Sequence, residues 1–131
     1  MATVDLTKDS FEEVVMGNPM VIVDFWAPWC GPCRGFAPVF ETASEDHADI
    51  VFAKVNTEEE QEIAAAFSIR SIPTLMVFRD KVILYSQAGA QPAGQFGELI
   101  AKAREVDMAR VRKEIAGREK DGEAGEATLS G

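Results

Sequence analysis

The sequence predicts an α/β protein with a central mixed β-sheet and helices on both faces of that sheet. Apolar runs of strand length alternate with amphipathic helical segments, which favours parallel pairing, and a short turn joins the last two strands as a hairpin. A chain of 131 residues with 47% hydrophobic content also suits one globular domain with a substantial core.

The first half of the chain contains two predicted strand–helix units. A short strand at residues 4–6 precedes a helix that ends at Gly17-Asn18-Pro19. Residues 20–26 are nearly all apolar, as expected of a central strand covered on both faces. A helix over residues 34–48 follows, and Pro38 inside it removes a backbone donor, so we expect a kink there.

The second half supplies the remaining strands. Residues 50–55 form an apolar strand, and the helix after it has an apolar face that ends at Phe67. Residues 74–78 and 82–85 are the strands of the hairpin, and the last helix begins at Gly94.

We expect the folded domain to comprise residues 1–104. Residues 105–116 could extend the last helix, because apolar residues recur there among many charges. Residues 117–131 are rich in Gly, Glu and Ala and contain no aromatic residue, so we expect a disordered tail.

The charge balance and the N-terminus narrow the possible partners. Thirteen basic and 22 acidic residues give a net charge of -9, which argues against nucleic acid and against an anionic membrane surface. The N-terminus has no signal-peptide pattern, and no apolar stretch is long enough to cross a bilayer. We therefore expect a cytoplasmic protein, with a monomer as the default oligomeric state.

The two cysteines of the chain stand in the segment Trp29-Cys30-Gly31-Pro32-Cys33, between a predicted strand and a predicted helix. Thiol–disulfide exchange needs a thiolate attacker and a second thiol that releases the mixed disulfide. Because unpaired N–H groups and the helix dipole favour negative charge at a helix N-terminus, we expect Cys30 to be the nucleophile and Cys33 the resolving thiol.

The residues between the cysteines suit this geometry, and the rest of the chain offers little for other cysteine chemistry. Gly31 allows a tight turn, and Pro32 has φ fixed near the helical value. A structural zinc site needs about four ligands, whereas the chain has two Cys and a single His, His47, so we expect no metal. We expect His47 on a helix surface, too far along the chain for a Cys–His hydrolase.

Two charged residues, Asp24 and Lys54, interrupt apolar strands. A buried Asp24 would have a raised pKa, which suits a proton acceptor near a thiol, and Lys54 could offset part of the burial cost. Alternatively, each side chain points outward at a strand end, and the pattern leaves both readings open. Trp29 is either a core aromatic residue or, as its place beside Cys30 favours, an exposed lid over the thiols.

Several segments together resemble the thioredoxin family over residues 4–104: Trp29 to Cys33, the strand Val23 to Ala27, Pro38, and Ile72-Pro73-Thr74 before a strand. The segments Val55 to Glu58 and Arg70 to Pro73 are most similar to the bacterial thioredoxin-2 type. The zinc-binding cysteines that usually precede the domain in that type have no counterpart here, so that role is not carried over. The resemblance implies the thioredoxin fold.

The resemblance also implies residue roles in the reduction of protein disulfides by dithiol–disulfide exchange. Cys30 would attack, Cys33 would resolve, and Asp24 would move protons for Cys33, with Lys54 near that carboxylate. Pro73 would be cis, although by itself a proline that opens a strand is most simply trans. The apolar patch that docks extended substrate segments would consist of Trp29, Ile72, Pro73, Gly89 and Ala90.

The partners implied by the family are disulfide-containing proteins and thioredoxin reductase, an NADPH-dependent flavoprotein that would reset the Cys30–Cys33 disulfide. The domain itself would bind no cofactor. Two alternatives stay open: a disulfide oxidant or isomerase, and a protein-binding module that acts independently of redox state.

One departure from the family lies in the hairpin turn, which reads Asp80-Lys81 where Asn-Gly is usual. Because Lys tolerates positive φ poorly, we expect a different turn type here.

Overall fold

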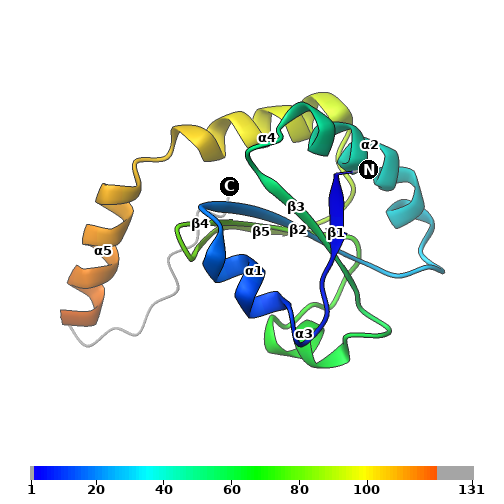
Figure 1. Cartoon of the computed structure of the whole chain (residues 1–131), viewed down its shortest axis with the longest axis horizontal. Coiled ribbons are helices and arrows are strands. Elements are labelled where there is room, and N and C mark those ends of the chain that lie inside the picture. The colour runs from blue at the N-terminus through cyan, green and yellow to red at the C-terminus, as the bar shows by residue number, and fades with distance from the viewer. Residues whose placement is uncertain (1, 121–131) are drawn as a thin grey trace.

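The structure is a computed structural model that describes residues 2–120, and it has five strands in one mixed sheet with helices on both faces (Figure 1). The elements in chain order are β1 (Thr3–Asp5), α1 (Phe11–Gly17), β2 (Met20–Trp26), α2 (Gly31–Asp46), β3 (Val51–Asn56), α3 (Gln61–Ala66), β4 (Thr74–Arg79), β5 (Val82–Ala88), α4 (Ala93–Glu105) and α5 (Met108–Lys120).

The sheet has the strand order β1-β3-β2-β4-β5, which places β2 at its centre. Strand β3 pairs in parallel with β1 and β2, whereas β4 is antiparallel to both β2 and β5. The prediction of a mixed sheet is therefore confirmed. Helices α2 and α4 lie over one face of the sheet and α1 and α3 over the other (Figure 1).

The alternation of side chains along β2 divides its apolar run between two cores. Met20 and Ile22 pack under α2 and α4, while Val21, Val23 and Phe25 pack against α1 and α3. Both faces of the strand are thus buried, as its nearly continuous apolar sequence predicts.

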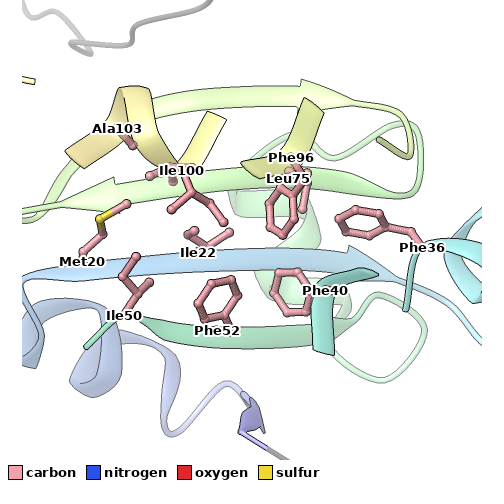
Figure 2. Close-up of a cluster of buried hydrophobic side chains, with 11 residues drawn as sticks. Met20, Ile22, Phe36, Phe40, Ile50, Phe52, Leu75, Phe96, Ile100 and Ala103 are labelled. Carbon is pink, nitrogen blue, oxygen red and sulfur yellow. The ribbon is translucent and has the colours of Figure 1, made fainter. Parts of the chain in front are cut away.

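Aromatic rings fill the core under α2 and α4 (Figure 2). The ring centroids of Phe40 and Phe52 lie 5.3 Å apart in an edge-to-face arrangement, and those of Phe36 and Phe96 are also 5.3 Å apart. Such pairs add about 0.5–1.5 kcal/mol each beyond the burial of apolar area. This core fixes α2 against the centre of the sheet, and with it the segment that holds both cysteines.

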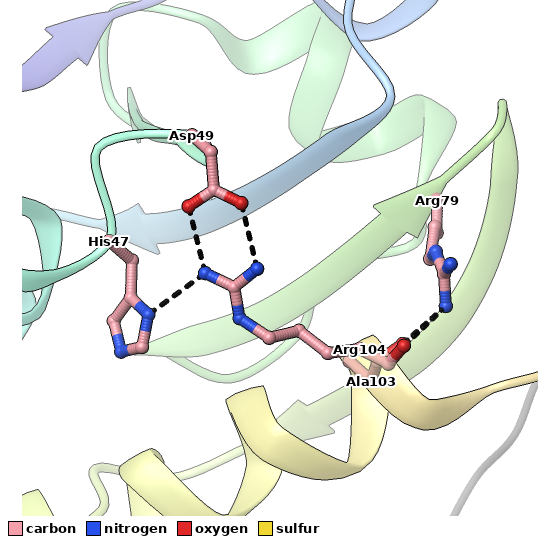
Figure 3. A network of polar contacts seen from close by, with 5 residues as sticks. All are labelled: His47, Asp49, Arg79, Ala103 and Arg104. Atoms are coloured by element: carbon pink, nitrogen blue, oxygen red, sulfur yellow. Dashed lines mark hydrogen bonds and ion pairs between the residues drawn. The ribbon is translucent and has the colours of Figure 1, made fainter.

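An arginine attaches the C-terminal end of α4 to the loop between α2 and β3 (Figure 3). The guanidinium of Arg104 donates to both carboxylate oxygens of Asp49, at 2.7 and 2.8 Å, and lies 3.0 Å from Nδ1 of His47. The hydrogen bond from Arg104 lowers the pKa of Asp49 to about 2. His47, expected on a helix surface, is the half-buried residue that follows α2.

The chain beyond α4 differs from the predicted extension of the last helix over residues 105–116. Helix α4 ends at Glu105, Val106 is extended, and a separate helix begins at Met108. Arg79 explains the stop, because its Nη1 donates to the carbonyls of Ala103, Arg104 and Val106 at 2.8–3.0 Å and satisfies the end of α4 (Figure 3).

Helix α5 starts at an N-terminal cap and is attached to the hairpin. The Asp107 carboxylate accepts from the backbone N–H of Arg110 at 3.2 Å. Met108 is buried, and Arg112 forms an ion pair with Asp80 at 3.0 Å. The helix continues through residues 117–120, while the rest of the predicted disordered tail, residues 121–131, lies outside the described residues.

The expectation of another turn type between β4 and β5 is wrong. Asp80 and Lys81 have φ values of 51° and 71°, so both residues adopt the left-handed conformation that a two-residue hairpin favours. The backbone N–H of Asp80 donates to the carbonyl of Pro19 at 2.8 Å, which holds the turn in place. Lys81 therefore occupies a conformation that suits Gly.

Replacing Lys81 by Gly should stabilise the protein. The substitution removes the cost of a left-handed side-chain residue but adds entropy to the unfolded chain, so we expect a net gain of about 0.5–1 kcal/mol in the free energy of unfolding. Urea unfolding measures it. Lys81→Ala is the matched control, since it shortens the side chain but keeps the Cβ, and a gain as large as that of Lys81→Gly would contradict the backbone explanation.

Candidate active site

Cys30 caps the N-terminus of α2, the longest helix at the centre of the fold. The residue is extended (φ -86°, ψ 113°), and its Sγ accepts from the backbone N–H of Cys33 at 3.2 Å. The helix starts at Gly31, three residues before the predicted start, with Pro32 in its first turn. The positive end of the α2 dipole therefore points at the Cys30 sulfur.

Cys30 and Cys33 are joined by a disulfide with a Cα–Cα distance of 5.3 Å. Both residues are largely buried, and Cys30 is the more exposed, with 5% of its surface accessible against 2% for Cys33. They pack with Ala27, and Gly31 and Pro32 above them are exposed. The order of exposure agrees with the order of roles expected from the sequence.

The loop before β4 meets the disulfide. The Ile72–Pro73 peptide bond is cis, which confirms the expectation from the family resemblance. The carbonyl oxygen of Ile72 lies 3.7 Å from Sγ of Cys30, and the Ile72 side chain packs against the cysteine cluster. This brings residues 42 positions apart in the sequence into one site.

The other residues of the expected docking patch divide by exposure. The Gly89 N–H donates to the carbonyl of Pro73 at 2.8 Å, and its φ of 116° is one that residues with a side chain rarely adopt. Gly89 and Ala90 are exposed and Ile72 is half-buried, whereas Pro73 is buried and contributes through its backbone. Trp29 is 64% exposed, which favours the lid over a core residue.

Asp24 is buried in the centre of the sheet, so the alternative of an outward side chain is excluded. It is 1% exposed, and neither carboxylate oxygen has a hydrogen-bond partner among residues 2–120. By strand alternation it shares the face of β2 with Met20 and Ile22, the face that α2 covers. Burial raises the pKa of Asp24 to about 7, although the positive charge of Lys54 opposes the shift.

Lys54 is next to Asp24 in the sheet register, on the neighbouring strand β3. Its side chain is half-buried, and Nζ lies 4.7 Å from the centroid of the Trp26 ring, in a cation–π arrangement. The charge of Lys54 is therefore held at the edge of the buried carboxylate's surroundings by an aromatic ring rather than by an ion pair.

The structure adds two polar contacts that sequence reasoning missed. The indole N–H of Trp29 donates to the Glu58 carboxylate at 2.6 Å, although Glu58 was expected only as part of a solvated helix N-terminus. Arg34 Nη1 donates to the carbonyl of Pro28 at 2.9 Å across the loop that carries Cys30. No sequence signal pairs Trp29 with Glu58, because their contact depends on how β2 and β3 end side by side.

Two searches limit the site to thiol chemistry within the part of the chain described. No group of three or more His, Cys, Asp or Glu side chains among residues 2–120 is arranged to hold a metal ion. None of the described helices is long and apolar enough to cross a membrane.

The buried carboxylate should make the stability of the protein fall as pH rises. The pKa of Asp24 is 3.8 in the unfolded chain and about 7 when folded, so the penalty is absent below pH 3.8, grows between the two values and is constant above pH 7. A shift of this size corresponds to about 4 kcal/mol. Asp24→Asn should lose this pH dependence and be more stable than wild type at pH 8.

Urea unfolding at intervals from pH 4 to 8.5 measures both proteins. Asp49→Asn is the control, because that carboxylate is exposed and titrates near pH 2, outside the measured range. Parallel stability curves for wild type and Asp24→Asn would contradict the burial argument.

Comparisons with known proteins agree with this geometry. The sequence model of the family described as Thioredoxin matches residues 2–102. A Streptomyces coelicolor protein assigned as thioredoxin 2 is 50% identical over 115 residues, which cover 88% of this chain and 86% of the relative. The thioredoxin of Alicyclobacillus acidocaldarius is 44% identical over 101 residues, 76% of this chain and 96% of the relative.

Solved structures give the same result for the fold. A Plasmodium falciparum thioredoxin superposes with a TM-score of 0.71 at 33% identity, over 76% of this chain and 97% of that one. A mutant thioredoxin from Halobacterium salinarum gives a TM-score of 0.73 at 32% identity, over 80% and 92% of the two chains. The fold is thus the thioredoxin fold, and the chain belongs to the thioredoxin family of protein-disulfide oxidoreductases.

Proposed function

We propose that this protein reduces disulfide bonds of other proteins by dithiol–disulfide exchange. The observation that carries the proposal is the disulfide at the N-terminus of α2, where Cys30 is the more exposed sulfur and lies against the Ile72–Pro73 loop. A substrate segment laid along that loop would bring its own disulfide to Cys30.

The reaction proceeds through one mixed disulfide. The Cys30 thiolate attacks one substrate sulfur, the substrate S–S bond breaks, and the first substrate thiolate leaves and takes up a proton. Cys33 then attacks Sγ of Cys30, which breaks the mixed disulfide and releases the second substrate thiolate. The substrate gains two electrons and two protons, and the Cys30–Cys33 pair is oxidised.

Asp24 is the proposed proton acceptor for Cys33. A general base works best when its pKa lies near the working pH, and burial raises the pKa of Asp24 to about 7. The carboxylate has no competing hydrogen bonds among residues 2–120. Lys54 moderates the shift through its charge and thereby sets how readily Asp24 accepts the proton.

The remaining parts of the proposal follow the family. Residues 1–104 form the catalytic domain, and exposed Trp29, Gly89 and Ala90 dock substrate beside Ile72 and Pro73. An NADPH-dependent flavoprotein, thioredoxin reductase, resets the disulfide, and the domain needs no bound cofactor. The protein acts as a monomer in the cytoplasm, where thiols are kept reduced.

The cysteine variants test the reaction. In an insulin reduction assay with dithiothreitol as the reductant, Cys30→Ser should abolish catalysis because it removes the attacking sulfur. Cys33→Ser should instead accumulate a mixed disulfide with insulin, visible on non-reducing gels. If both variants reduce insulin like wild type, the proposal fails, and if wild type oxidises reduced substrates more readily than it reduces insulin, the oxidant alternative holds.

Asp24→Asn tests the proton transfer. We expect the release of substrate from the mixed disulfide to slow by about 10²-fold near pH 7, the lower end of what a positioned general base contributes. Stopped-flow tryptophan fluorescence from pH 6 to 9 measures the rate. The difference from wild type should shrink as pH rises and Cys33 ionises without help, and an equal rate at pH 7 would remove Asp24 from the mechanism.

A further inference from the structure

A groove runs between β5, the edge strand of the sheet, and helix α4. Its volume is about 300 Å³, and its lining is mainly apolar. The lining residues that matter here are Leu84, Leu99, Ala103, Val106, Tyr85 and Gln91. A cavity of this size lies at the small end of ligand sites and suits one bulky side chain better than a cofactor.

Gln91 gives the groove a polar group with one free hydrogen-bonding position. The residue is 8% exposed, and its Nε2 donates to the Tyr85 hydroxyl at 2.8 Å. Its Oε1 has no hydrogen-bond partner among residues 2–120. Because buried polar groups in native proteins nearly always have partners, this acceptor points to a donor that arrives with a bound molecule.

The groove continues the proposed docking patch. Gln91 directly follows Ala90, and Gly89 is hydrogen-bonded to the Pro73 carbonyl at 2.8 Å, so one end of the groove lies next to the loop that meets the disulfide. The rim carries Glu98 and Lys102, one charge of each sign, and so selects no charged occupant. The occupant that fits is apolar and carries an N–H donor.

We propose that the groove between β5 and α4 is a second docking site for substrate proteins of this disulfide reductase. It takes one bulky apolar side chain of the substrate, whose neighbouring main-chain N–H donates to Oε1 of Gln91. The proposal rests on the proposed function, because a substrate must first engage the Cys30–Cys33 pair. It predicts selectivity among protein disulfides that the disulfide itself does not provide.

The test compares a protein disulfide with one too small to reach the groove. Pre-reduced full-length protein is mixed with insulin or with DTNB, a small aromatic disulfide, and the second-order rate of Cys30–Cys33 oxidation is followed by tryptophan fluorescence. Leu99→Trp fills the groove and should lower the insulin-to-DTNB rate ratio about tenfold, the loss expected when one interface anchor is removed. Gln91→Met removes the acceptor at nearly constant shape and should lower the same ratio by a smaller factor.

Ala101→Trp is the matched control, since Ala101 is exposed on the same helix and does not line the groove. Its rate ratio should equal that of wild type. An unchanged ratio in Gln91→Met, which carries the test should Leu99→Trp fail to fold, would overturn the proposal. A wild-type dimer by analytical ultracentrifugation that Leu99→Trp abolishes would also overturn it, in favour of a second copy in the groove. Wild type that reacts with neither disulfide would instead refute the proposed function.

Discussion

The burial of β2 on both faces and both edges is the constraint on which the rest of the structure depends. Strands β3 and β4 pair with it on either side, and two separate cores cover its faces. A strand held in this way has a fixed end, so the loop that follows Trp26 delivers Cys30 to one place at the start of α2. The aromatic core between α2, α4 and the sheet holds the helix that receives it.

The same burial gives the protein an unstable group at its centre. Asp24 has no hydrogen-bond partner among residues 2–120, and its ionised form costs stability at neutral pH. A fold with less apolar packing around it could not keep such a group, because an uncompensated buried charge is among the most costly defects. The aromatic core therefore does more than hold the fold, since it supplies the low-polarity surroundings that bring the pKa of Asp24 near neutrality.

The edge of the sheet is organised by arginines rather than by apolar contacts. Arg79 satisfies the last carbonyls of α4, and Arg104 attaches the same helix to the loop after α2. Arg112 then joins α5 to the hairpin through Asp80. These contacts place α4 along β5 and so define the groove that begins beside the active site. The hairpin residue Asp80 thus has a role that an Asn-Gly turn would lack.

The sequence by itself determined the strand and helix order, the buried centre and the cysteine pair, because hydrophobic periodicity and the Cys-x-x-Cys spacing are local signals. It left open whether Asp24 faces the core, and it mistook the turn at Lys81 and the continuation past Glu105. Those features depend on partners far along the chain: α2 over Asp24, Pro19 and Arg112 beside Asp80, Arg79 at the end of α4. Only the tertiary structure brings Glu58 to Trp29 and Gln91 to the groove, since no local pattern encodes contacts between separate elements.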